Sequence, residues 1–224
     1  MMQQQIGKKI FIYLFLFFFL GTFNNQKLLD LNQFAIKNIT IESSDNTNFD
    51  ELSDKILNQQ KLNIFFINLN NIKNIIENNN LVEKYYVIKN YPFSLKIKII
   101  KTKFFSRLNV DGKIFNIGTN GKLTEGSSDG NNLPFIFGNP SIGRVIEFYT
   151  IINNSKFNFS DFKNLFYYKS GRWDIETIEG VIIKLPNNEL EKKLQEIYDI
   201  ISNKNFTNQK IIDARIINQL ILHD

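Results

Sequence analysis

The stretch VEKYYVIKNYPFSLKIKI, residues 82–99, predicts a β-hairpin. Tyr91 and Pro92 supply a turn signal between two runs that are rich in β-branched, aromatic and aliphatic residues. In the second run Leu95, Ile97 and Ile99 alternate with polar residues, so we expect these three side chains to share one buried face. The interleaved lysines then form the solvated face of an amphipathic strand, and we favour this interpretation over a nucleic-acid-binding stripe.

Three further elements precede the hairpin. The segment FAIKNITIES, residues 34–43, is close to strand alternation. Asn48 and Glu51 have the spacing of a capping box at the start of a helix, and the run at 68–79 predicts a second short helix. The order β-α-α-β-β predicts one hairpin and two helices around a modest core.

The N-terminus carries an apolar run from Ile10 to Leu20 that directly follows Lys8 and Lys9. Residues 10–23 would span about 21 Å as a helix, against about 30 Å for the hydrocarbon core of a bilayer. That length suits a signal peptide, but no small-residue cleavage site follows. We therefore interpret 10–23 as a short transmembrane anchor and 1–9 as a cytoplasmic N-terminus, with the body of the chain outside the cytoplasm.

The stretch GRWDIETIEGVIIKLPNNELEKKL, residues 171–194, poses a choice between an acidic active site and a structural hairpin. A turn at Glu179-Gly180 separates an alternating run from an apolar one, which favours the hairpin. Asp174 and Glu176 lie two apart, so we expect both on the solvated face of a strand. We expect Trp173, the only tryptophan, to be buried on the other face.

A helix is expected to follow this hairpin. Asn188 and Glu191 again have capping-box spacing, and the apolar residues from Leu190 to Ile201 have helical periodicity. We expect Trp173 to pack between the hairpin and this helix, which should begin near Glu189.

The composition excludes much of the usual enzymatic chemistry. The chain of 224 residues has no cysteine and one histidine, His223, so a cysteine nucleophile, a cysteine-rich or two-histidine metal site and a disulfide are excluded. Its net charge of +5 comes from basic residues spread along the chain rather than gathered in a patch. We therefore predict a non-enzymatic protein with no cofactor, no metal, no nucleic acid and no small-molecule substrate.

The order of motifs resembles the FtsQ/DivIB family of bacterial cell division proteins. The β-α-α-β-β unit after an apolar N-terminal segment is similar to a POTRA domain. The resemblance continues through VDGKIFNIGTNGKL (110–123), LPFIFG (133–138), RWDIETIEGVIIKLP (172–186) and IIDARIINQLIL (211–222). It implies an α+β fold with an N-terminal transmembrane helix, a POTRA domain at 30–101 and a C-terminal β-rich domain with flanking helices at 102–224.

The resemblance also implies a function. Proteins of this family are scaffolds of the divisome, the septation machinery, and their last region engages the coiled-coil pair FtsB–FtsL. Here that region is a terminal strand at about 210–222, expected at a sheet edge, where free main-chain groups can pair with a partner strand. The site residues implied are Arg215, Ile216, Asn218, Leu220 and Leu222. Arg215 is expected to point outward, so that Arg215→Glu weakens association without unfolding the domain. The resemblance further implies a single-pass protein of the inner membrane, with its body in the periplasm at the division septum.

Two alternatives stay open. A POTRA-containing protein of outer-membrane assembly or secretion would carry several POTRA repeats or a barrel. A periplasmic wall-active enzyme would carry a deep cleft lined by an acid–base pair of carboxylates.

Overall fold

The computed structural model describes residues 3–23, 34–45, 47–58, 63–126, 133–202, 210–216 and 219–223. Its helices and sheets confirm an α+β protein. The chain divides into two compact units. The first unit comprises the described residues up to 42, with 48–75 and 86–98. The second comprises the described residues of 43–47, with 76–85 and those from 99 onward.

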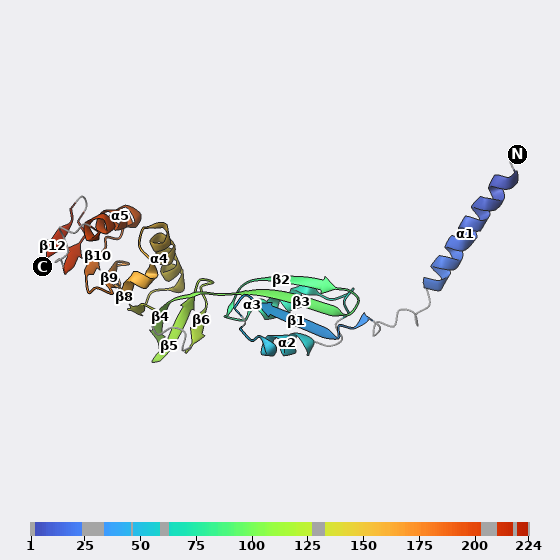
Figure 1. Ribbon diagram of the computed structural model, residues 1–224, viewed down its shortest axis with the longest axis horizontal. Coiled ribbons are helices and arrows are strands. Elements are labelled where there is room, and N and C mark those ends of the chain that lie inside the picture. The colour runs from blue at the N-terminus through green and yellow to red at the C-terminus, as the bar shows by residue number, and fades with distance from the viewer. Residues whose placement is uncertain are drawn as a thin grey trace. The chain divides into compact units, whose positions relative to one another are not determined.

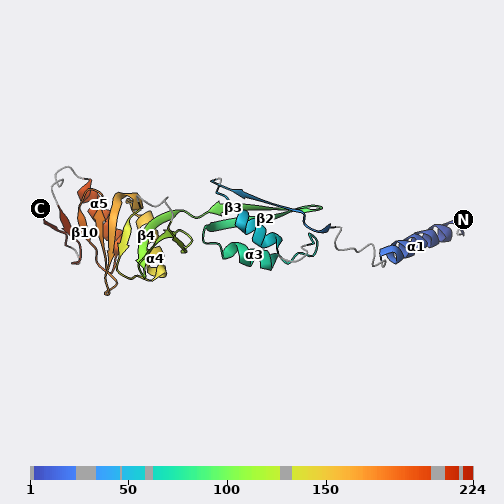
Figure 2. The same cartoon turned by 90° about the horizontal axis from the view of Figure 1, so that it is seen from below.

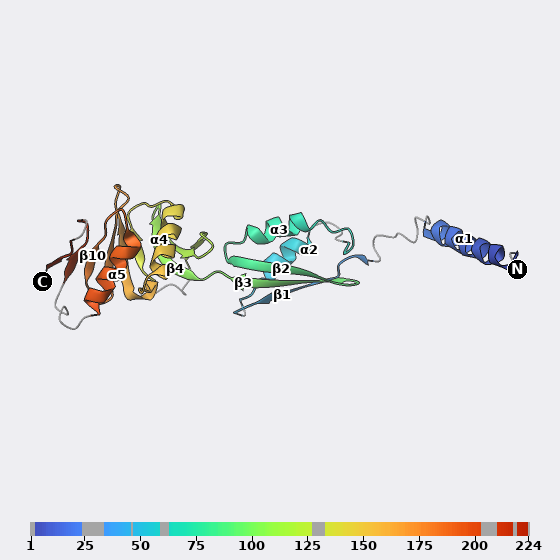
Figure 3. The ribbon, with the colours of Figure 1, turned by 90° about the horizontal axis from the view of Figure 1, so that it is seen from above.

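A three-stranded sheet contains the hairpin that the sequence predicts. Its strands are β1 (Asn38–Ser43), β2 (Val82–Asn90) and β3 (Ser94–Lys101), in the order β1-β3-β2. The helices α2 (Asp50–Leu57) and α3 (Leu69–Glu77) lie on one face of this sheet (Figure 3). The alternating residues of β3 are buried at this core as expected: Leu95, Ile97 and Ile99.

The helix starts differ from the two predicted capping boxes. α2 has Phe49 at its N-cap position and no side-chain cap, and the Asn48 side-chain Oδ1 instead accepts the Asp50 N–H at 2.8 Å. α5 (Leu190–Ile201) follows Glu189, whose φ of 57° is left-handed, and it also lacks a side-chain cap. Both helices exist, but neither predicted box forms.

The N-terminal helix α1 (Gln3–Phe23) covers the apolar run, and its side chains from Ile10 to Leu20 are exposed. Within the described part of the chain, no helix combines the length and the apolar character needed to cross a membrane.

A nine-stranded sheet forms the rest of the fold. Its order is β12-β11-β10-β9-β8-β7-β4-β5-β6. The strand bounds are β4 (Phe104–Val110), β5 (Lys113–Gly118), β6 (Leu123–Glu125), β7 (Phe135–Phe137), β8 (Phe162–Tyr167), β9 (Trp173–Thr177), β10 (Ile182–Lys184), β11 (Ile211–Asp213) and β12 (Ile221–His223). The sheet is mixed: β7 runs parallel to β4 and β8, β10 runs parallel to β11, and the other pairs are antiparallel.

One face of this sheet is covered by α4 (Ile142–Asn154) and α5, which lie side by side over it (Figures 1 and 2). Residues in register form an aliphatic row across that face: Leu108, Ile136, Leu165, Ile175, Ile183, Ile212 and Leu222. Both helices turn buried residues to the same core, including Phe148 of α4 and Leu194 of α5. Side chains that alternate with this row therefore lie on the other side of the sheet, which we call the open face.

Trp173 is buried, with 4% of its surface exposed, as the sequence predicts. Its aromatic neighbours do not come from the helix that was expected to begin near Glu189. The ring stacks on Phe148 of α4 at 4.6 Å between centroids, and Tyr167 of β8 lies 4.8 Å away. The helix that supplies its stacking partner is thus α4, which the sequence pattern does not predict.

Candidate partner-binding surface

A row of side chains crosses the open face from β7 to the edge strand β12. Register pairs place Phe137, Phe166, Asp174, Lys184, Asp213 and Ile221 side by side on six consecutive strands. The row is aromatic at β7 and β8, charged from β9 to β11 and apolar again at β12. Neighbouring strands lie about 4.8 Å apart, so each charge in this row has its neighbours within direct electrostatic reach.

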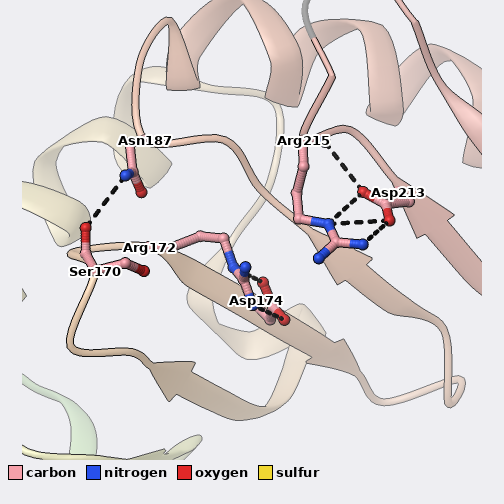
Figure 4. A network of polar contacts seen from close by, with 6 residues as sticks. All are labelled: Ser170, Arg172, Asp174, Asn187, Asp213 and Arg215. Carbon is pink, nitrogen blue, oxygen red and sulfur yellow. Dashed lines mark hydrogen bonds and ion pairs between the residues drawn. The ribbon is translucent and has the colours of Figure 1, made fainter.

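Asp174 is not on a solvated face, which corrects the sequence prediction. Only 3% of its surface is exposed, because the sheet continues on both sides of β9. Its carboxylate accepts two hydrogen bonds from the Arg172 guanidinium, at 3.1 and 3.4 Å (Figure 4). Arg172 in turn lies over the Tyr168 ring, 4.3 Å from its centroid. Burial of this carboxylate is stabilised by a charge-assisted pair with Arg172, whose side chain is 23% exposed.

Arg215 makes an equivalent pair with Asp213. Its Nε lies 2.8 Å from Oδ1, its terminal nitrogen reaches Oδ2, and its backbone N–H donates to Oδ1 at 3.1 Å (Figure 4). Arg215 is exposed, with 43% of its side chain accessible, but its head group turns back onto the buried Asp213. A glutamate at position 215 would place a second negative charge against the Asp213 carboxylate and destabilise the domain. Arg215→Glu therefore cannot test partner binding independently of folding.

We expect the Asp213–Arg215 pair to make stability depend on pH. The hydrogen bonds from Arg215 hold the pKa of Asp213 below its usual value. Its contribution to stability is then complete above the unfolded pKa of about 3.9 and is lost as the pH falls through the lower folded pKa. Arg215→Met should lower the free energy of unfolding at pH 7, and the difference from wild type should narrow progressively as the pH falls below about 4. Urea unfolding at several pH values measures this, and a gap that stays constant down to pH 2.5 would contradict it.

The terminal segment is two short strands rather than the single expected strand. β11 pairs with β10 and β12, whereas β12 forms the outer edge of the sheet. Of the predicted site residues, Ile216 is 50% exposed between the two strands, and Leu220 and Leu222 pack partly against the core. Asn218 lies outside the described residues. The structure thus brings Arg215, Leu220 and Leu222 to one end of the sheet. At that end the outermost strand is β12, which contains only Leu222 of these three residues.

Carboxylates also occur near a hollow of about 480 Å³ on another part of the domain, which Asp161 and Glu179 help to line. Asp161 accepts the Asn158 N–H at 2.8 Å and thereby caps the 3-10 helix η3 (Phe159–Asp161). Glu179 lies in the exposed turn between β9 and β10. Nowhere in the described ranges do three His, Asp or Glu side chains gather closely enough to hold a metal ion.

The sequence analysis does not predict the two ion pairs at this row, Arg172–Asp174 and Asp213–Arg215, although a signal for them exists. Arg172 and Asp174 are opposite charges two apart, and so are Asp213 and Arg215. Residues two apart on or beside a strand share a face, so both spacings allow ion pairs.

The fold and this surface define an α+β protein with a large mixed sheet, one face of which is covered by helices. Residues 99–215, just over half of the chain, match the family model described as cell division protein FtsQ/DivIB, C-terminal. The chain therefore belongs to the FtsQ/DivIB family of cell division proteins.

Relatives and a solved structure accompany this match. The cell division protein FtsQ of Rickettsia bellii is 28% identical over 197 residues, covering 81% of this chain and 69% of the relative. FtsQ of Rickettsia typhi is 25% identical over 189 residues, covering 81% and 70%. The extracytoplasmic domain of DivIB from Geobacillus stearothermophilus has 12% identity and a TM-score of 0.35, covering 46% of this chain and 94% of that one. The family assignment rests on the sequence comparisons.

Proposed function

We propose that this protein is a non-enzymatic, membrane-anchored scaffold of the bacterial divisome. Residues 10–23 anchor it in the inner membrane as a single-pass protein, with residues 1–9 in the cytoplasm. A POTRA domain at 30–101 and a β-domain at 102–224 then lie in the periplasm at the division septum. Membership of the FtsQ/DivIB family and the apolar run after Lys8 and Lys9 support this assignment.

The partner in this proposal is an FtsB–FtsL-type coiled-coil pair that adds a strand to β12. The observation that carries it is the edge position of β12 in the nine-stranded sheet. An edge strand offers one row of main-chain donors and acceptors, which a partner strand can satisfy. Selectivity in this proposal comes from side chains that belong to β12 or are close to it in sequence: Arg215, Ile216, Asn218, Leu220 and Leu222.

Proline substitutions in β12 test this proposal. Consecutive residues of a strand point their N–H groups to opposite sides, so Pro at Ile221 or at Leu222 removes an outward donor in one case and a donor to β11 in the other. The variant that loses the outward donor should retain at least tenfold less FtsB–FtsL pair on co-purification of the full chain from detergent extracts, a difference of about 1.4 kcal/mol.

The control is Ile114→Pro on β5, far from β12 in the strand order, with circular dichroism to check the folding of each variant. If both β12 variants fold and retain the pair like wild type, the terminal edge is not the binding site. The hairpin at residues 81–100 would then be tested next.

A further inference from the structure

A second surface lies on the open face where β4, β7 and β8 meet. It is a hollow of about 610 Å³, and Arg107, Phe135, Lys163, Asn164 and Ile178 help to line it. Register pairs run from Arg107 to Phe135 and from Phe135 to Asn164, so the three side chains lie side by side on adjacent strands. The strands β9, β10 and β11 separate this hollow from β12.

Among the described residues, the charges around the hollow leave one cation, Arg107, without an anionic partner. Lys163 pairs with Glu176 at 2.9 Å, and Glu176 also accepts the Asn164 amide at 2.7 Å. Arg107 donates from Nε and a terminal nitrogen to the Leu133 carbonyl, at 3.3 and 3.2 Å, and no carboxylate in the described ranges forms an ion pair with it. The half-buried guanidinium is thus fixed in place by a neutral group, and none of the described carboxylates compensates its charge.

The apolar part of the hollow continues into an exposed aromatic patch. Phe135 and Phe137 lie 4.9 Å apart between ring centroids, and Phe137 stacks on Phe166 at 5.2 Å. Phe137 is 45% exposed and Ile178 is 64% exposed. Exposed apolar side chains grouped beside a charge are typical of a surface that contacts another protein, because contact removes the apolar area from water.

We propose that this hollow binds an extended peptide segment of another protein, which places an Asp or Glu carboxylate against Arg107 and an aliphatic or aromatic side chain over Phe135. A carboxylate matches the planar donors of a guanidinium that is already held in position. Adjacent strands place Arg107 and Phe135 about 5 Å apart, which side chains one or two positions apart on an extended peptide can span. The aromatic patch favours a peptide over a small free anion, which would leave these rings in water.

This site is independent of the terminal edge. Strand addition at β12 uses main-chain groups of the last strand, whereas the hollow uses side chains of β4, β7 and β8. A negative result for the β12 edge therefore does not contradict the hollow as a binding site, or the reverse. Each site is tested by its own variants.

A library of random heptapeptides provides the probe, with the full chain immobilised in detergent. Peptides recovered on the wild type should carry Asp or Glu within two positions of an aliphatic or aromatic residue. Arg107→Gln should abolish the preference for Asp or Glu and lower the affinity for the recovered peptides at least tenfold. Phe135→Ala should abolish the preference for an aliphatic or aromatic residue. The matched control is Arg144→Gln, an exposed arginine of α4 that pairs with Glu147 at 2.9 Å, and it should retain binding.

Each other outcome overturns the proposal. Arg107 is excluded as the anion site if the recovered peptides show no preference for Asp or Glu. It is also excluded if a folded Arg107→Gln variant, with unchanged circular dichroism, recovers the same peptides as the wild type. Asp129, which lies outside the described residues, offers an intramolecular alternative: if Asp129→Asn creates peptide binding that the wild type lacks, a carboxylate of the same chain occupies the guanidinium. A dimer in sedimentation that Arg107→Gln dissociates would make a second copy of the chain the occupant.

Discussion

Trp173→Ala should lower the free energy of unfolding of the nine-stranded domain by about 3–5 kcal/mol. The ring is buried, stacks within 13° of parallel on Phe148 of α4, and has Tyr167 of β8 at its side. Truncation therefore removes both the burial of a large ring and the contact that joins the sheet to its covering helix. The total free energy of unfolding of a domain is about 5–15 kcal/mol, so this substitution removes a large share of its stability.

Guanidinium denaturation followed by circular dichroism measures this loss, because the variant has no tryptophan fluorescence. Trp173→Phe is the matched variant: it keeps an aromatic ring against Phe148 and should cost about 1–2 kcal/mol. A Trp173→Ala variant that is as stable as wild type yet no longer retains its partners would assign the ring to an interface instead.

The two hairpins illustrate what the sequence determines locally. In both, alternation and a turn signal lie within about twenty residues, so β2–β3 and β9–β10 follow from the pattern alone. The burial of Trp173 follows from the same alternation. Its partner Phe148 does not, because that residue lies on α4, brought in by tertiary packing rather than by nearby sequence.

Asp174 shows why alternation predicts a face but not its exposure. The residue does point away from the helix-covered core, as expected, but β8 and β10 on either side shield it with Phe166 and Lys184. Arg172 then makes burial of the carboxylate tolerable. The depth of a strand within a wide sheet depends on strand order, which single-sequence patterns do not contain.

The terminal segment was expected as one strand because its residues are mostly apolar and contain neither Gly nor Pro to mark a turn. The chain instead reverses after Arg215, and β12 returns along β11 so that Leu222 joins the aliphatic row beside Ile212. Partial burial of that leucine against the core gives a physical reason for the reversal. It also moves the available edge from the middle of the segment to residues 221–223.

Gly138→Ala should be a second strongly destabilising change, at about 2–5 kcal/mol, because two separate costs meet at this position. Gly138 follows β7 with φ of +96°, a conformation that residues with a Cβ rarely adopt. A Cβ here would also lie 2.2 Å from the carbonyl oxygen of Tyr167, at the end of β8. Since that atom belongs to the backbone, β7 and β8 must move apart to accept the methyl group.

Gly171→Ala separates the two costs, because Gly171 has φ of +83° but no atom within 4 Å of an added Cβ. It should cost only about 1–2 kcal/mol, the penalty of the left-handed conformation, so the difference between the two variants measures the clash with Tyr167. Trp173, in register with Tyr167, reports both transitions by fluorescence during guanidinium denaturation. Equal losses for the two variants would show that β7 and β8 absorb the methyl group without strain. An excess for Gly138→Ala should instead come with weaker peptide binding at Phe135, because the same displacement of β7 from β8 disturbs the aromatic patch.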